Sequence, residues 1–242
     1  MNYEKDLEKT ASNYHLNIIS GWEGLYSKMR KELFSRLSRY FKGNHVLELG
    51  CGDGEMTLLL ADSFKSVTVV DGSETMLNEC KIRLENKNNI EYHKSYFEDY
   101  KSDKKFDVII MSHVLEHLDN PVQVLQKISS LLKEDGVLLI AVPNADSIHR
   151  QVAVEMNLIP TCDSLNEQDL LLGHRRVYTL DGLKQHCLEA KYSIIDFGGL
   201  MLKPLTNRQI EEQWSEDMVE GFIKLGDKFP HLSAEIFVVL KK

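Results

Sequence analysis

Short apolar segments alternate with helical segments between residues 45 and 143, and this alternation limits the possible folds more than any other feature. The predicted strands are residues 45–49, 67–70, 90–93, 106–111 and 137–142. Strands that are apolar along most of their length are typical of parallel sheets with helices on both faces. Crossovers between such strands are right-handed. The chain is therefore predicted to have an α/β fold built on a parallel sheet.

An amphipathic helix is predicted before the first strand. Leu25, Met29, Leu33 and Leu37 recur at helical spacing with basic residues between them, and Gly43-Asn44 ends the pattern. We interpret residues 1–42 as an N-terminal helical cap and residues 43–242 as the main domain.

The second half of the chain has less regular patterning. Residues 144–178 and 199–230 are predicted to be irregular insertions, with a short helix near 147–157. A helix is predicted over 179–190, and the last strands over 192–197 and 234–240. Long insertions at the carboxyl ends of strands usually contact substrate. We expect both insertions to face the acceptor of a reaction.

Composition excludes several classes of protein. The net charge is 29 − 37 = −8, which argues against a nucleic-acid partner because phosphate binding needs clustered basic residues. The first residues do not resemble a signal peptide, and no segment approaches the roughly 20 apolar residues of a spanning helix. The four cysteines lack metal or disulfide spacing. We expect a cytoplasmic protein with free thiols and no membrane partner.

A glycine-rich loop follows the first predicted strand. Gly50, Gly52 and Gly54 stand between that strand and a helix, and Asp71 ends the next strand. Glycine allows close approach of the backbone to a ligand, and an acidic residue about 20 positions later suits a ribose diol. No Lys-Ser or Lys-Thr follows, which excludes a Walker A loop. The G-x-G-x-G spacing also departs from the G-x-G-x-x-G of dinucleotide folds.

Six segments in order resemble motifs of class I S-adenosylmethionine-dependent methyltransferases, in the branch that includes quinone-biosynthesis enzymes. They are residues 46–54 (VLELGCGDG), 67–73, 90–100, 106–121, 136–144 and 174–183. The resemblance implies a Rossmann-like, seven-stranded, mostly parallel sheet with helices on both faces and an antiparallel last strand. It also implies S-adenosyl-L-methionine as cofactor and S-adenosyl-L-homocysteine as product.

The resemblance further implies roles for individual residues. The backbone of Gly50 and Gly52 would face the methionine portion of the donor, and Asp71 would bind the ribose. Glu48 would orient the amino group through the loop. The remaining implied donor contacts are Cys51, Gly72, Ser73, Met76, Phe97, Glu98, Ser112 and His113. Ser95-Tyr96 departs from the Gly-Asp of many relatives, so the adenine contacts are the least well defined.

Histidines after the fourth predicted strand are the catalytic candidates. His113 to His117 matches H-x-x-E-H, but a metal site of that kind needs a regular helix, which is expected only from Asn120-Pro121 onwards. We therefore expect no metal. His117 could act as a general base or order its own loop, and His174 could face the acceptor.

Two further groups of residues have alternative interpretations. One group could bind an anionic acceptor or lie on a solvated surface: His149, Arg150, Arg175 and Arg176. The other could close over the donor or pack against the sheet: Tyr14, His15, Trp22 and Tyr26.

The sequence favours methyl transfer to a small molecule, with O-methylation preferred and N- or C-methylation left open. The turn at 112–115 lacks the Asn/Asp-Pro-Pro-aromatic motif of nucleic-acid adenine methyltransferases. A catalytically silent donor-binding module and a nicotinamide-dependent oxidoreductase are the alternatives. The sequence does not indicate the oligomeric state.

Overall fold

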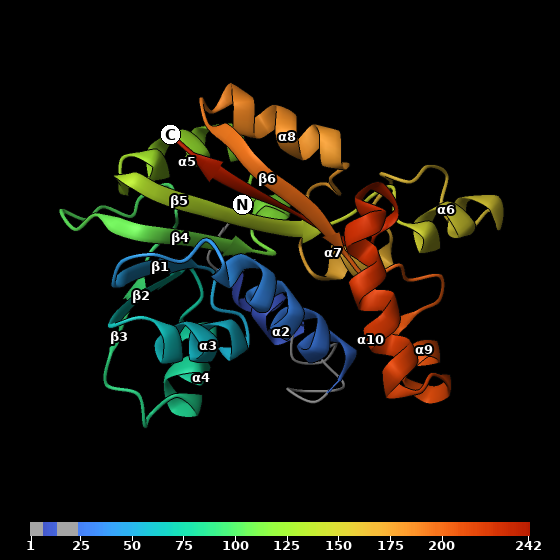
Figure 1. The fold of residues 1–242 in the computed structure, drawn as a ribbon, viewed down its shortest axis with the longest axis horizontal. Helices are drawn as coiled ribbons and strands as arrows, with labels where there is room; N and C mark the ends of the chain where they lie inside the picture. Colours follow the sequence, from blue (N-terminus) through green and yellow to red (C-terminus); the bar gives the residue numbers. More distant parts are fainter. Residues whose placement is uncertain (1–6, 14–23) are drawn as a thin grey trace.

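The computed structural model, which describes residues 7–13 and 24–242, has a seven-stranded sheet with helices on both faces (Figure 1). The strand order is β3-β2-β1-β4-β5-β7-β6, and β7 runs antiparallel to both of its neighbours. The strands are β1 (His45–Leu49), β2 (Ser66–Asp71), β3 (Ile90–Lys94), β4 (Phe106–Ser112), β5 (Leu132–Pro143), β6 (Ser193–Leu200) and β7 (Glu235–Lys241). The predicted fold class is confirmed.

The helices form two layers. One face of the sheet packs against α2 (Leu25–Ser38), α3 (Glu55–Ser63), α4 (Glu74–Arg83), α9 (Asn207–Gln213) and α10 (Glu216–Leu225). The other face packs against α5 (Pro121–Ser129) and α8 (Leu180–Glu189). Two short helices, α6 (Ile148–Glu155) and α7 (Glu167–Leu171), lie beyond the carboxyl ends of β4 and β5 (Figure 1).

Strand side chains alternate between two apolar cores. Val46 of β1 lies in the core beneath α2 and α3, whereas Leu47 and Leu49 lie in the core beneath α5 and α8. All three are completely buried. This alternation is the period-2 geometry of a strand, and it explains why both faces of a central strand must be apolar.

The strand order reverses between β1 and β4. Chain segments β1 to β3 extend the sheet in one direction, and β4 and β5 extend it in the other. Loops that leave the carboxyl ends of β1 and β4 therefore diverge, and open α/β sheets bind ligands in the crevice that results. The glycine loop follows β1, and His113 to His117 follows β4.

Two predictions of local structure were wrong. β5 begins at Leu132 rather than near residue 137, because Leu132 pairs with Phe106 before an irregularity in register. The segment 199–230, predicted to be irregular, contains α9 and α10, whose first residues are capped by the side chains of Thr206 and Ser215. Within the described ranges, no helix combines the length and apolarity required to cross a bilayer.

Candidate functional site

A cavity of about 440 Å³ lies at the carboxyl ends of the parallel strands, at the point where the strand order reverses. Its volume falls in the range of small-molecule sites. Ten of the donor contacts implied by the sequence line it: Gly50, Gly52, Asp71, Gly72, Ser73, Met76, Phe97, Glu98, Ser112 and His113. His117 and His174 line it as well. The fold therefore gathers nearly all of the candidate residues around one space.

The glycine loop adopts backbone conformations that L side chains rarely reach. Gly50, Gly52 and Gly54 have φ angles of 83°, 49° and 81°. A Cβ atom at Gly50 would lie 2.5 Å from Cγ2 of Val114, in the segment after β4. Glycine is therefore required at position 50 both for its φ angle and for the close contact between the two loops that border the cavity.

Asp71 stands at the end of β2 with its carboxylate held by the two flanking loops. The backbone N–H of Ser73 donates to Oδ1 at 2.8 Å, and that of Cys51 donates to Oδ2 at 3.1 Å. The Cys51 thiol also contacts Oδ2, at 3.6 Å. The carboxylate lies at the wall of the cavity and can accept from a ligand with two adjacent hydroxyl groups. Burial raises the pKa of Asp71, although these two hydrogen bonds oppose the shift.

Glu48 and Cys51, also implied as donor contacts, do not line the cavity. The Glu48 side chain is buried below the glycine loop, where the Thr57 hydroxyl donates to its Oε2 at 2.6 Å. Burial raises the pKa of Glu48 well above its ordinary value. Glu48 thus supports the loop from beneath, and Cys51 contributes its backbone N–H to Asp71.

A second group of residues borders the cavity opposite β2, around a short 3-10 helix, η2 (Leu115–His117). The rings of His117 and His174 meet edge to face, with their centroids 4.8 Å apart. Burial lowers the pKa of His117. His174 Nδ1 lies 3.1 Å from Asp169 Oδ1, so this contact fixes the orientation of its ring.

The loop that carries His174 is held against η2 by its own basic residues. The Arg175 N–H donates to the carbonyl of Glu116 at 2.9 Å, and its Nε donates to the carbonyl of His117 at 2.9 Å. Arg176 donates to the carbonyl of Leu118 at 2.7 Å. Arg175 and Arg176 therefore have partners within the protein, which favours a structural role over anion binding.

Arg150 is likewise engaged inside the protein, where it supports Asp169. Its Nε donates to the carbonyl of Cys162 at 2.7 Å, and its Nη1 lies 3.1 Å from Asp169 Oδ2. Burial opposes ionisation of Asp169, but the bonds from His174, Asn166 and Arg150 lower its pKa to about 2. His149 also lines the cavity, and burial lowers its pKa to about 3. His149 is therefore neutral at physiological pH.

His113 bridges two buried carboxylates. Its Nε2 lies 3.3 Å from Glu235 Oε1, and its Nδ1 lies 3.6 Å from Glu116 Oε1. Burial lowers the pKa of His113, but the two carboxylates outweigh burial and raise it to about 10. Sequence reasoning missed Glu235, since it reaches the site only because β7 starts beside the carboxyl end of β5, where Glu235 pairs with Pro143.

A helical segment at residues 7–13 covers part of the cavity, and sequence reasoning also missed its role. Glu8 accepts hydrogen bonds from the Ser73 hydroxyl at 3.0 Å and from the Glu74 N–H at 2.8 Å. At the other end, the Asn13 amide donates to the carbonyl of Leu171 at 3.1 Å. Tyr26 lines the cavity, whereas Tyr14, His15 and Trp22 lie outside the described residues.

Comparison with known proteins identifies the family. A family model for the methyltransferase domain matches residues 22–196, which is more than half of the chain. The chain belongs to this family, the class I S-adenosylmethionine-dependent methyltransferases. The resemblance inferred from the glycine loop and the later motifs is thereby confirmed.

A sequence relative and a solved structure, both named as methyltransferases, agree with this assignment. Ubiquinone biosynthesis O-methyltransferase of Actinobacillus pleuropneumoniae is 30% identical over 127 residues, or 50% of this chain and 54% of the relative. The chain thus matches about half the length of such curated relatives. N-methyltransferase NodS of Bradyrhizobium japonicum, solved with S-adenosyl-L-homocysteine, has a TM-score of 0.64 at 12% identity and covers 100% of this chain and 99% of its own.

A third comparison supports the same fold. Magnesium protoporphyrin IX methyltransferase from Synechocystis, also solved with bound S-adenosyl-L-homocysteine, has a TM-score of 0.61 at 15% identity. It covers 90% of this chain and 84% of its own. At such identities the two solved structures establish the fold alone.

Proposed function

We propose that the chain transfers a methyl group from S-adenosylmethionine to a hydroxyl group of a small-molecule acceptor. The observation that carries the proposal is the cavity that joins the glycine loop and Asp71 to the histidines after β4. The relatives named as ubiquinone biosynthesis O-methyltransferases favour an oxygen acceptor. The donor supplies a methyl group on a positively charged sulfur, and its transfer to the hydroxyl leaves S-adenosylhomocysteine and a proton.

The residues on the β2 side of the cavity fit the donor. Asp71 offers two carboxylate oxygens for the ribose hydroxyls, and Gly50 and Gly52 line the cavity without a Cβ atom that would obstruct the methionine portion. Met76, Tyr96 and Phe97 supply apolar contacts for the adenine ring. Tyr96 is the departure noted in the sequence, and it lines the cavity with its ring close to Gly72.

The residues on the η2 side fit an acceptor whose hydroxyl must lose a proton. His117 and His174 both line the cavity. Their position is held by Asp169 and by the hydrogen bonds of Arg175. Positioning of the two reactants and assistance in proton removal are the main contributions that a protein can make to such a displacement.

Calorimetric titration with S-adenosylhomocysteine tests the donor, with NADH and NADPH titrated in parallel. We expect micromolar binding of S-adenosylhomocysteine alone. Nicotinamide binding in its place would contradict the proposal and favour an oxidoreductase.

Turnover is tested with labelled donor against panels of phenols, alcohols and amines. We expect labelled product from a hydroxyl acceptor, and His117→Ala should lower turnover far more than donor affinity. His45→Ala, a substitution of an exposed histidine at the start of β1, is the matched control and should leave both unchanged. Labelling of amines alone would contradict O-methylation, and an absence of turnover with every acceptor would indicate a silent module.

A further inference from the structure

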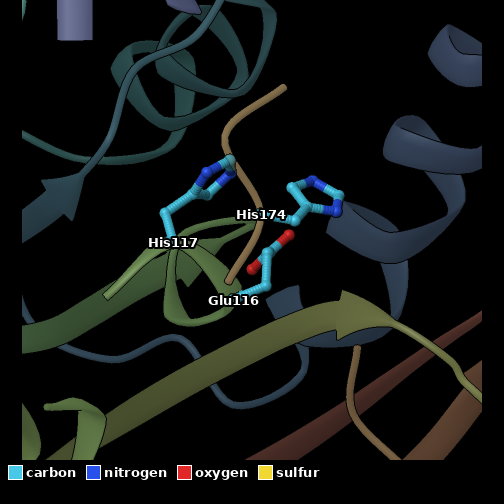
Figure 2. A group of neighbouring side chains, drawn as sticks. All are labelled: Glu116, His117 and His174. Atoms are coloured by element: carbon cyan, nitrogen blue, oxygen red, sulfur yellow. The ribbon is translucent and has the colours of Figure 1, made fainter. Parts of the chain in front are cut away.

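Three side chains at the edge of the cavity form a group with the chemistry of metal ligands. Glu116 and His117 come from η2, and His174 comes from the loop after α7. One potential ligand atom from each lies within 4.8 Å of the other two. Figure 2 shows the carboxylate of Glu116 close to the side chains of His117 and His174.

The carboxylate of Glu116 is the most unusual member of the group. Its side chain is completely buried, and among the described residues neither of its oxygens accepts a hydrogen bond. Its nearest ionic partner among the described residues is His113, which it shares with Glu235, and His113 Nδ1 lies 3.6 Å from Oε1, beyond hydrogen-bonding distance. Burying a carboxylate without donors is costly, and native proteins compensate such groups with a cation or a hydrogen bond.

Both histidines are already oriented by a second contact. His174 Nδ1 bonds to Asp169, which leaves Nε2 available. His117 forms a hydrogen bond to the backbone of Gly173, which engages one of its two ring nitrogens. Histidines that ligate metals usually have this arrangement, with a carboxylate or a carbonyl on the nitrogen that does not face the metal.

We propose that Glu116, His117 and His174 bind a divalent transition-metal cation at the wall of the cavity. Two imidazoles and one carboxylate form a ligand set of catalytic zinc sites and of other first-row divalent metals. With bonds of about 2.0–2.1 Å, ligand atoms around a tetrahedral cation lie about 3.3 Å apart. Binding would therefore draw the three groups together by small side-chain movements.

The geometry also explains why the H-x-x-E-H motif was misleading. The sequence disfavours a metal held by His113 and His117 together, because no regular helix is expected to carry both residues. In the structure, residues 115–117 form a 3-10 turn, and His113 lies between Glu116 and Glu235, outside the cluster. The second histidine of the cluster is His174. It is held in place because the neighbouring Arg175 donates hydrogen bonds to the carbonyl groups of Glu116 and His117.

The chemical role of the cation rests on the proposed function. His117 and His174 line the cavity, so the open coordination positions would face the acceptor. A cation there would bind the acceptor hydroxyl and favour loss of its proton to solvent, which makes the oxygen a better acceptor of the methyl group. The substrate class is thereby narrowed to small molecules with a hydroxyl that can coordinate a divalent metal.

The test uses untagged full-length protein that is first stripped with a chelator. Co²⁺ and Zn²⁺ are titrated alone, with visible absorption and calorimetry as readouts. We expect one cation per chain, and affinities weaker by at least about 100-fold in Glu116→Gln and His174→Gln, because even outer contacts of metal sites cost 10–100-fold. His45→Gln is the matched control and should bind as the unsubstituted protein does.

Thermal melting and S-adenosylhomocysteine titration of the same samples separate the possible outcomes. Glu116→Gln keeps the shape of the side chain and removes a buried charge, so it should fold and bind S-adenosylhomocysteine normally. No saturable cation binding, or equal binding by Glu116→Gln, would overturn the metal site. Cation binding without any S-adenosylhomocysteine binding would support the metal site and overturn the proposed function.

Discussion

The two sides of the cavity are built in opposite ways. The β2 side uses backbone groups and one carboxylate from residues 50–73, which are close in sequence and are held by parallel strand pairing. The η2 side uses side chains from η2, from the loop after α7 and from β7. The first side depends on local backbone geometry, and the second depends on long-range contacts between side chains.

This difference shows how one fold can keep the binding site for one ligand while the site for a second ligand changes. A glycine loop and a carboxylate that stand directly at strand ends are positioned by the sheet, independently of the insertions. Side chains from separate insertions can change without altering the sheet. We therefore expect substitutions on the two sides to have different consequences.

The largest effect is expected at Arg150, which supports the η2 side. Arg150→Leu leaves Asp169 buried without its cationic partner, and breaking a buried ion pair in this way costs about 3–5 kcal/mol. Urea unfolding should report the loss. Arg208→Leu, on an exposed surface, is the control and should leave the midpoint unchanged. Equal midpoints for Arg150→Leu and the unsubstituted protein would show that the η2 side does not depend on this pair.

Gly50→Val should disrupt the contact between the two sides. A side chain at a φ of 83° costs about 1–2 kcal/mol, and overpacking against Val114 adds about 1–3 kcal/mol. Unfolding free energy and S-adenosylhomocysteine affinity should both fall. Gly221→Ala in α10, where a Cβ meets nothing within 4 Å, should instead stabilise the protein by up to about 1 kcal/mol. Normal S-adenosylhomocysteine binding by Gly50→Val would contradict a close approach of the loop.

Asp71→Asn should weaken binding of S-adenosylhomocysteine by about 1–3 kcal/mol, because one of its two acceptors becomes a donor. Calorimetry measures the affinity directly. Cation binding at the η2 side should not change, and this result would show that the substitution affects the β2 side alone. Asp103→Asn, at an exposed position, serves as the control. Unchanged affinity would remove Asp71 from the ribose role.

The smallest effect is expected at Ser73, which caps α4 and contacts the segment 7–13. Its hydroxyl oxygen accepts from the Met76 N–H at 3.2 Å and donates to Glu8. Ser73→Ala should cost about 1 kcal/mol, the usual value of an N-cap. Limited proteolysis should also become faster within residues 7–13. Unaltered proteolysis would show that the hydrogen bonds from Glu74 and Thr75 hold Glu8 in place without Ser73.

The β2 side could be predicted from the sequence because its signals are local. Gly50, Gly52 and Asp71 stand at the ends of strands that are recognisable from their apolar residues, and all three line the cavity. The sheet itself was predictable for the same reason. β5 extends further than predicted because Leu132 pairs through an irregular register, which no local pattern encodes.

The η2 side could not be predicted in the same way. Glu235 reaches His113 because the last strand runs antiparallel beside β5, and Asp169 reaches His174 through a turn of α7. Neither residue lies in a pattern that identifies its partner. In contrast, α9 and α10 were missed although they carry capping residues: Thr206, with Gln209 three positions later, is a recognisable start signal.

The position of β7 has a consequence for the order in which the molecule can assemble. β6 joins the sheet only through β7, which lies between β5 and β6. During synthesis, β6 therefore leaves the ribosome before the strand that will connect it to the sheet exists. The pairing of β1 to β5 can form earlier, and the cavity gains Glu235 only when β7 inserts. A nascent chain should thus form the β2 side of the cavity before the η2 side gains Glu235, and residues 235–241 complete both the sheet and the cavity wall.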